Sequence, residues 1–173
     1  KEIVYQPIAW DAKDMELDSG TIDCIWNGFT MTGREENYTW SEPYMANKQV
    51  FVVKKDSGIT TLEDLAGMTV DVQIDSSAEA ALKEEENADL TSSFGALLTV
   101  ADYNTAFMDL EAGAVDAIAM DDVVASYQIE SRDADFIVLE EALAEEDYGI
   151  GFKKRNEELR ERVQSTLEEM AEA

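Results

Sequence analysis

Extended and helical patterns alternate along most of this chain, and that alternation is what most limits the folds open to it. Short runs rich in Val, Ile and Thr predict strands, and segments with apolar residues at helical spacing separate them. Strands are expected at residues 2–8, 21–26, 49–53, 69–73, 97–101, 115–120, 136–139 and 148–152. Helices are expected at residues 11–17, 61–67, 78–86, 104–112, 123–131 and 156–170. Strands joined by helices of this length are typical of parallel β-α-β units, so the sequence predicts an α/β fold.

Residues that start or stop helices support these boundaries. Gly20 and Gly113 follow predicted helices, where glycine adopts the left-handed conformation that ends a helix. Residues 75–77, Asp-Ser-Ser, supply N-cap chemistry for the helix at 78–86, and we expect Thr61 and Asn156 to cap two others.

Charge and missing residue types argue against several functions. The 173 residues include 39 acidic and 13 basic ones, a net charge of −26. Such a field repels nucleic acid and anionic lipid, so a nucleic-acid-binding protein is not expected. Histidine is absent, which removes Ser-His-Asp triads and histidine-ligated zinc. The one cysteine, Cys24, lies in an apolar run and is interpreted as a buried residue. We expect no metal and no other cofactor.

Three loops follow predicted strands, where ligands bind in α/β sheets: residues 27–34, 73–78 and 120–122. The guanidinium of Arg34 can hold a carboxylate through two parallel hydrogen bonds, or it can pair at the surface with neighbouring glutamates. The backbone N–H groups around Ser77 can bind an anion or simply be capped. The carboxylate of Asp121 can take an ammonium group or cap the next helix. Together these residues would trap a zwitterion.

Six blocks in order resemble the polar amino-acid-binding proteins of ABC importers, which have the type II periplasmic-binding-protein fold. They are residues 19–23, 28–32, 38–44, 62–67, 113–117 and 148–152. The resemblance implies a protein that binds a free amino acid between two lobes and delivers it to the importer's membrane subunits. It also implies a periplasmic or extracellular location, with a lipid anchor in the full-length protein.

The resemblance assigns roles to individual residues. The backbone of Gly28 and the side chain of Thr30 would meet the ligand's ammonium, with Asp121 as countercharge. Arg34 and the amides of Thr30 and Ser77 would hold its carboxylate. Three more positions would contact or tune the ligand's side chain, and they suggest glutamine or cystine: Trp10, Gln73 and Met120. Trp10 can equally be a core residue.

The sequence departs from the family pattern in four places. Ser77 stands where the family normally has Gly or Thr, and nothing matches the family's C-terminal tail. Arg34 lies one residue closer to the Thr-x-Thr pair than usual, which implies a deletion. Nothing matches the family's initial strand-helix unit, so lobe 1 (residues 1–44 and 149–173) would be incomplete, whereas lobe 2 (residues 45–148) would be complete. Lobe 1 would then expose unpaired backbone and apolar surface. We therefore expect a fragment, or a swapped or complementing chain that fills the gap.

Two other functions fit the same fold. One is an enzyme of the dehydratase type, but without histidine its acid or base would have to be a carboxylate. The other is a ligand-sensing module that is not coupled to transport.

Overall fold

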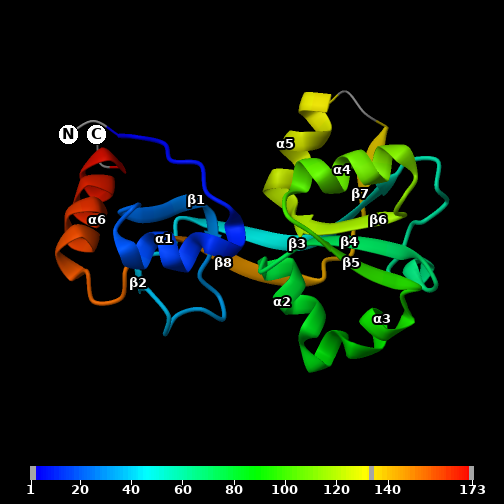
Figure 1. Cartoon of the computed structure of the whole chain (residues 1–173), viewed down its shortest axis with the longest axis horizontal. Helices are drawn as coiled ribbons and strands as arrows, with labels where there is room; N and C mark the ends of the chain where they lie inside the picture. Colours follow the sequence, from blue (N-terminus) through cyan, green and yellow to red (C-terminus); the bar gives the residue numbers. More distant parts are fainter. Residues whose placement is uncertain (1–2, 133–134, 172–173) are drawn as a thin grey trace. The chain divides into compact units, whose positions relative to one another are not determined.

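The computed structural model describes residues 3–132 and 135–171, and its helices and strands alternate along the chain (Figure 1). Its contacts divide the chain into two compact units. Unit 1 comprises Lys1–Ala46 and Glu146–Ala173, and unit 2 comprises Asn47–Glu145. The chain enters unit 2 within strand β3 (Met45–Lys54) and returns to unit 1 within strand β8 (Ala144–Phe152).

Unit 2 contains the parallel strands that the sequence predicts. Strand β4 (Thr69–Gln73) pairs in parallel with β5 (Ala96–Val100) on one side and with β6 (Ala117–Asp121) on the other. Strand β6 then pairs antiparallel with β3, which also pairs antiparallel with β7 (Phe136–Val138). The α/β fold class is therefore confirmed.

Helices cover both faces of this sheet (Figure 1). One face packs against α2 (Ser77–Lys83) and α3 (Ala88–Ser93), and the other against α4 (Tyr103–Ala112) and α5 (Asp122–Arg132). Successive side chains of a strand point to opposite faces, so the run Val50-Phe51-Val52-Val53 supplies both cores, and each of its residues is at most 3% exposed. A sheet covered on both faces needs such a continuous apolar run.

Two predicted helix boundaries are confirmed in atomic detail. Ser76 is the N-cap of α2, where its Oγ accepts a hydrogen bond from the backbone N–H of Glu79 at 3.1 Å. Gly113 ends α4 with a φ of 73°, a left-handed conformation that suits glycine. Both signals are local, which is why they can be read from the sequence.

Unit 1 is built around strands β1 (Cys24–Thr30) and β2 (Thr39–Trp40), which both pair antiparallel with β8. Helices α1 (Lys13–Ser19) and α6 (Glu157–Ala171) complete it. Phe29 is fully buried, and its ring lies 5.1 Å from that of Tyr38 and 4.9 Å from that of Trp40. Gly151 makes room for this cluster, since a Cβ there would lie 2.7 Å from the Phe29 ring.

Several predicted elements differ from those observed. The strand expected at residues 21–26 begins at Cys24 and continues to Thr30, so half of the predicted 27–34 loop is strand. The helix expected at 61–67 is only a 3-10 turn, Glu63–Leu65. Thr61 does not cap it. Instead the carboxylate of Asp64 accepts hydrogen bonds from the backbone N–H groups of Thr60 and Thr61, and these bonds lower the pKa of Asp64.

The strand expected at residues 2–8 is also absent from the described part of the segment, residues 3–8. Ile3, Val4 and Tyr5 have the residue types of a strand, yet they are 74%, 78% and 89% exposed. A strand forms only where a neighbour supplies backbone partners, and no described strand pairs with these residues. The expected incompleteness of lobe 1 and a complementing chain remain predictions.

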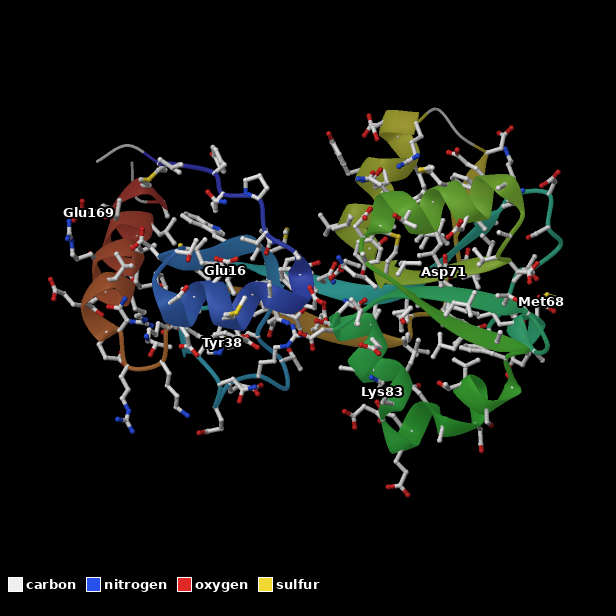
Figure 2. All side chains as sticks on the ribbon, viewed as in Figure 1. Glu16, Tyr38, Met68, Asp71, Lys83 and Glu169 are labelled. Atoms are coloured by element: carbon white, nitrogen blue, oxygen red, sulfur yellow. The ribbon has the colours of Figure 1, made fainter. Side chains whose placement is uncertain are left out.

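A buried carboxylate lies inside the sheet of unit 2, on β4 (Figure 2). Asp71 is 1% exposed, and among the described residues neither of its carboxylate oxygens has a hydrogen-bond partner of normal geometry. Burial and, to a smaller extent, the nearby negative charge of Asp109 on α4 together raise the pKa of Asp71 to about 6. The ionised form of Asp71 is therefore a cost to unit 2 at neutral pH.

We expect Asp71→Asn to raise the free energy of unfolding of unit 2 at pH 7 by about 1 to 3 kcal/mol. The folded state holds the Asp71 proton up to a pH of about 6, whereas the unfolded chain releases it near 3.8. The parent protein therefore loses this stability as the pH rises between those values, and the advantage of the variant is small at pH 4 and largest at pH 7. Amide hydrogen exchange in β4–β6 measures this difference in the free energy of unfolding. Asp109→Asn removes only the like charge and should give a smaller gain; equal stability of parent and Asp71→Asn at pH 7 would contradict the prediction.

Candidate functional site

The first group of predicted site residues lies in unit 1, where β1 contains a bulge. Ile25 pairs with Gly151 and Phe29 with Gly149, so the register shifts between them. Gly28 lies in this bulge with a φ of 79°, and a Cβ there would be 3.0 Å from the ring of Tyr148. Only glycine combines that backbone conformation with so close a neighbour. The bulge thus requires Gly28, which lies two residues before Thr30 in β1.

Thr30 is held at the end of β1 by a buried carboxylate. Its hydroxyl donates a hydrogen bond to Oε1 of Glu146 at 2.8 Å, and both residues are at most 9% exposed. Nearby, the backbone N–H of Met31 donates to the carbonyl of Asp147 at 2.8 Å. A threonine whose hydroxyl proton is donated keeps its oxygen lone pairs as acceptors, which suits contact with an ammonium group.

Arg34 packs against the same aromatic cluster. Its guanidinium carbon lies 5.3 Å from the Phe29 ring, and its Nη1 lies 3.4 Å from the carbonyl oxygen of Thr30. The indole N–H of Trp40 donates to the Arg34 carbonyl at 3.1 Å, which fixes the backbone of this residue. The half-buried guanidinium is therefore positioned by unit 1 beside Thr30, as stacking on an aromatic face favours.

Trp10 belongs to this cluster as well. Its ring meets Phe29 edge to face at a centroid distance of 5.6 Å, and the ammonium of buried Lys13 lies 5.2 Å from the Trp10 ring. These contacts are those of a packing residue at the margin of the core. Its predicted contact with the side chain of a ligand remains a prediction.

The second group lies in unit 2, at the carboxyl ends of two parallel strands. Val72 of β4 pairs with Ala119 of β6, so Gln73 and Asp121 end their strands at the same edge of the sheet. Helix α2 begins at Ser77, a few residues after β4. This is the edge at which α/β sheets bind ligands.

Three neutral hydrogen-bond donors contact the carboxylate of Asp121. Its Oδ1 lies 2.9 Å from Nε2 of Gln49 and 3.3 Å from Nδ2 of Asn47. Its Oδ2 lies 3.4 Å from the hydroxyl of Tyr103 on α4. Neutral donors orient a carboxylate and stabilise its charge without cancelling it. The arrangement of these groups suits a carboxylate that meets a cationic ligand.

The remaining predicted residues of unit 2 differ in accessibility. Gln73 is partly exposed and donates from Nε2 to the carbonyl of Ala101 at 3.1 Å. Ser77 is also partly exposed at the start of α2. Met120 is fully buried among the residues that pack against α4 and α5, so its side chain contributes to the core. The ligand contacts predicted for these three residues remain predictions.

Sequence reasoning missed four polar residues that contact the predicted ones: Asn47, Gln49, Tyr103 and Glu146. A signal existed for two of them, because Asn47 and Gln49 stand two positions apart directly before the apolar run of β3. Polar residues at that spacing share one face of a strand. Glu146 gave no such signal, since it lies among other acidic residues.

The sequence matches the model of bacterial extracellular solute-binding proteins, family 3, over residues 1–173. The chain belongs to this family. The resemblance to amino-acid-binding proteins of ABC importers is confirmed.

Two curated relatives illustrate the range of ligands in this family. The chain is 30% identical to the L-cystine-binding protein TcyJ of Escherichia coli (strain K12), covering 98% of the chain and 62% of TcyJ. It is 29% identical to the arginine-binding extracellular protein ArtP of Bacillus subtilis (strain 168), covering 98% of the chain and 66% of ArtP. The chain thus spans somewhat less than two thirds of the length of these relatives.

A solved structure of the family shares the fold. The substrate-binding protein of an ABC uptake transporter from Streptococcus pneumoniae, solved with bound histidine, is 34% identical, with a TM-score of 0.90 over 98% of this chain and 71% of that one. The type II periplasmic-binding fold is therefore confirmed. Among residues 3–132 and 135–171, no helix is long and apolar enough to cross a membrane.

We expect Thr30→Val to destabilise unit 1 by about 1 to 3 kcal/mol, because it removes a hydrogen bond to a buried carboxylate. All three tryptophans, Trp10, Trp26 and Trp40, lie in unit 1, so tryptophan fluorescence during urea unfolding reports on this unit. Thr32→Val is the matched control. Thr32 is exposed and only accepts a bond from the Asp147 N–H, so its loss should cost less. Equal stability of the two variants would show that the Thr30–Glu146 bond contributes no more than the exposed bond of Thr32.

Proposed function

We propose that the protein binds a free polar amino acid and delivers it to the membrane subunits of an ABC importer. The observation that carries the proposal is the carboxylate of Asp121, held at the end of β6 by Gln49 and Asn47. Family membership supports the same conclusion. We propose no catalytic role, because capture and release of a ligand require no bond to be broken.

We assign the ammonium and the carboxylate of the ligand to polar groups of the two units. In unit 2, Asp121 is the countercharge of the α-ammonium. In unit 1, the hydroxyl of Thr30 and the backbone of Gly28 also accept from the ammonium, and Arg34 and the amide of Thr30 hold the carboxylate. The amide of Ser77, in unit 2, is proposed to hold the carboxylate as well. A bound amino acid stabilises the protein conformation in which its ammonium and its carboxylate are both contacted. That conformation is the one that an importer would recognise.

The ligand's side chain is proposed to pack on Trp10, whereas Gln73 and Met120 are proposed to tune the specificity, Met120 from within the core. The partly exposed amide of Gln73 can donate and accept hydrogen bonds, which supports a polar ligand such as glutamine or cystine. The relatives described above bind cystine, arginine and histidine. A thermal-shift screen of the twenty amino acids and cystine tests the proposal; a panel in which none raises the melting temperature would refute it.

We expect Asp121→Ala to abolish binding of the amino acid that the screen selects. An ammonium group buried without its countercharge costs several kcal/mol, which exceeds what the other contacts supply. Isothermal titration calorimetry measures the loss. Asp122→Ala is the control, because it removes a neighbouring carboxylate at the start of α5 and should leave binding unchanged. Unaltered affinity in Asp121→Ala would remove this residue from the site.

Arg34→Ala should weaken binding by about 2 to 4 kcal/mol, because two charge-assisted hydrogen bonds to the carboxylate are lost. The loss should be confined to ligands with a free carboxylate, so the corresponding amino-acid amide serves as a second probe whose affinity changes little. Arg162→Ala, at an exposed position of α6, is the matched control. If the binding free energy of Arg34→Ala changed by only a few tenths of a kcal/mol, Arg34 would not be a ligand contact.

A further inference from the structure

Two buried amide side chains precede the apolar run of β3. Gln49 is 0% exposed and Asn47 is 5% exposed. Burying an amide is unfavourable unless it is hydrogen-bonded, and apolar residues would fill the same positions without that penalty. Their burial at the start of this apolar run therefore indicates that each amide has a hydrogen-bond partner.

The register of the sheet shows what the partner is. Gln49 of β3 lies directly opposite Asp121 of β6, and Asn47 lies two residues earlier on the same face. The 2.9 Å bond from Gln49 to Oδ1 of Asp121 has normal hydrogen-bond length, and the 3.3 Å contact from Asn47 to the same oxygen is longer. Gln49 is therefore the stronger of the two donors.

Asn47 also fixes the segment that follows Asp121. Its Oδ1 accepts from the backbone N–H of Val123 at 3.4 Å, while its Nδ2 faces Asp121. One amide thus contacts both the carboxylate and the first turn of α5. The orientation of Asp121 is set relative to the strand by Gln49 and relative to the helix by Asn47.

We propose that Gln49 and Asn47 are positioning residues that hold the carboxylate of Asp121 in the orientation required by the ligand's α-ammonium. This inference rests on the proposed function. Both donors are neutral, so they aim the carboxylate and leave its charge to attract the ammonium. A cationic side chain at either position would instead compete with the ligand.

Gln49→Leu keeps the volume of the side chain and removes the donor. The probes are the amino acid selected by the thermal-shift screen and its deaminated analogue, the same carboxylic acid without the α-ammonium, measured by calorimetry and by displacement. We expect the dissociation constant of the amino acid to rise about 10-fold or more, as the loss of one charge-assisted bond predicts. That of the analogue should change less than about 2-fold, because it does not use Asp121. Discrimination between the two probes therefore falls.

A structural role alone would give a different pattern. A less stable protein would show a smaller binding-competent fraction but the same ratio of the two dissociation constants. Gln164→Leu is the matched control, since Gln164 is another buried glutamine with two hydrogen bonds, on α6 of unit 1. It should leave the ratio unchanged. An unchanged ratio in Gln49→Leu would overturn the proposal.

Two further variants keep the test decisive. If Gln49→Leu does not fold, Asn47→Ser replaces it, with a smaller expected loss of discrimination because its contact with Asp121 is longer; an unchanged ratio there also overturns the proposal. Asp121→Asn is measured in parallel. If Asp121→Asn binds like the parent protein, the proposed ammonium site itself is wrong. If it fails to bind while Gln49→Leu discriminates normally, only the positioning role is wrong.

Discussion

The pairing of β3 with β6 in a single register determines most of what unit 2 can do. Because Val50 lies opposite Met120 and Val52 opposite Ile118, the apolar residues of both strands reach the core together. The same register sets Gln49 against Asp121 at the point where the apolar run ends. A shift by one residue would turn each side chain to the other face of the sheet, burying Lys48 and separating the carboxylate from its donor. Core and candidate site therefore depend on one alignment.

In unit 1 the strands are short, and contacts between large aromatic side chains, more than strand register, determine how the residues are arranged. Phe29 contacts the rings of Trp10, Tyr38 and Trp40, and Gly151 on β8 leaves the space that its ring occupies. The contacts with Trp10 and Tyr38 are edge to face, a geometry that fixes relative orientation as well as burying apolar area. Because Thr30 follows Phe29 directly and Arg34 stacks on its ring, the aromatic cluster also positions the polar groups of unit 1.

The sequence predicts best those features that depend on neighbours along the chain. The α/β class, the cap at Ser76 and the stop at Gly113 follow from local patterns, as does the placement of Asp121 at a strand end. The start of β8 could not be predicted, because Glu145 and Glu146 are poor strand residues until Thr30 and β3 supply partners. For residues 3–5 the prediction is wrong in the opposite way. They have the composition of a strand but form none, because no described strand pairs with them. Strand formation depends on distant partners, which a single sequence does not identify.

Asp71 and Asp121 show how local donors decide the role of an aspartate on neighbouring strands of one sheet. Asp121 ends its strand beside two amides and a tyrosine hydroxyl, which stabilise a carboxylate that can face a ligand. Asp71 lies mid-strand under α4, where burial and the negative charge of Asp109 together raise its pKa to about 6. The same functional group is thus suited to recognition in one place and costs stability in the other. The difference lies in the residues opposite: β6 presents apolar Ile118 to Asp71, whereas β3 presents Gln49 to Asp121.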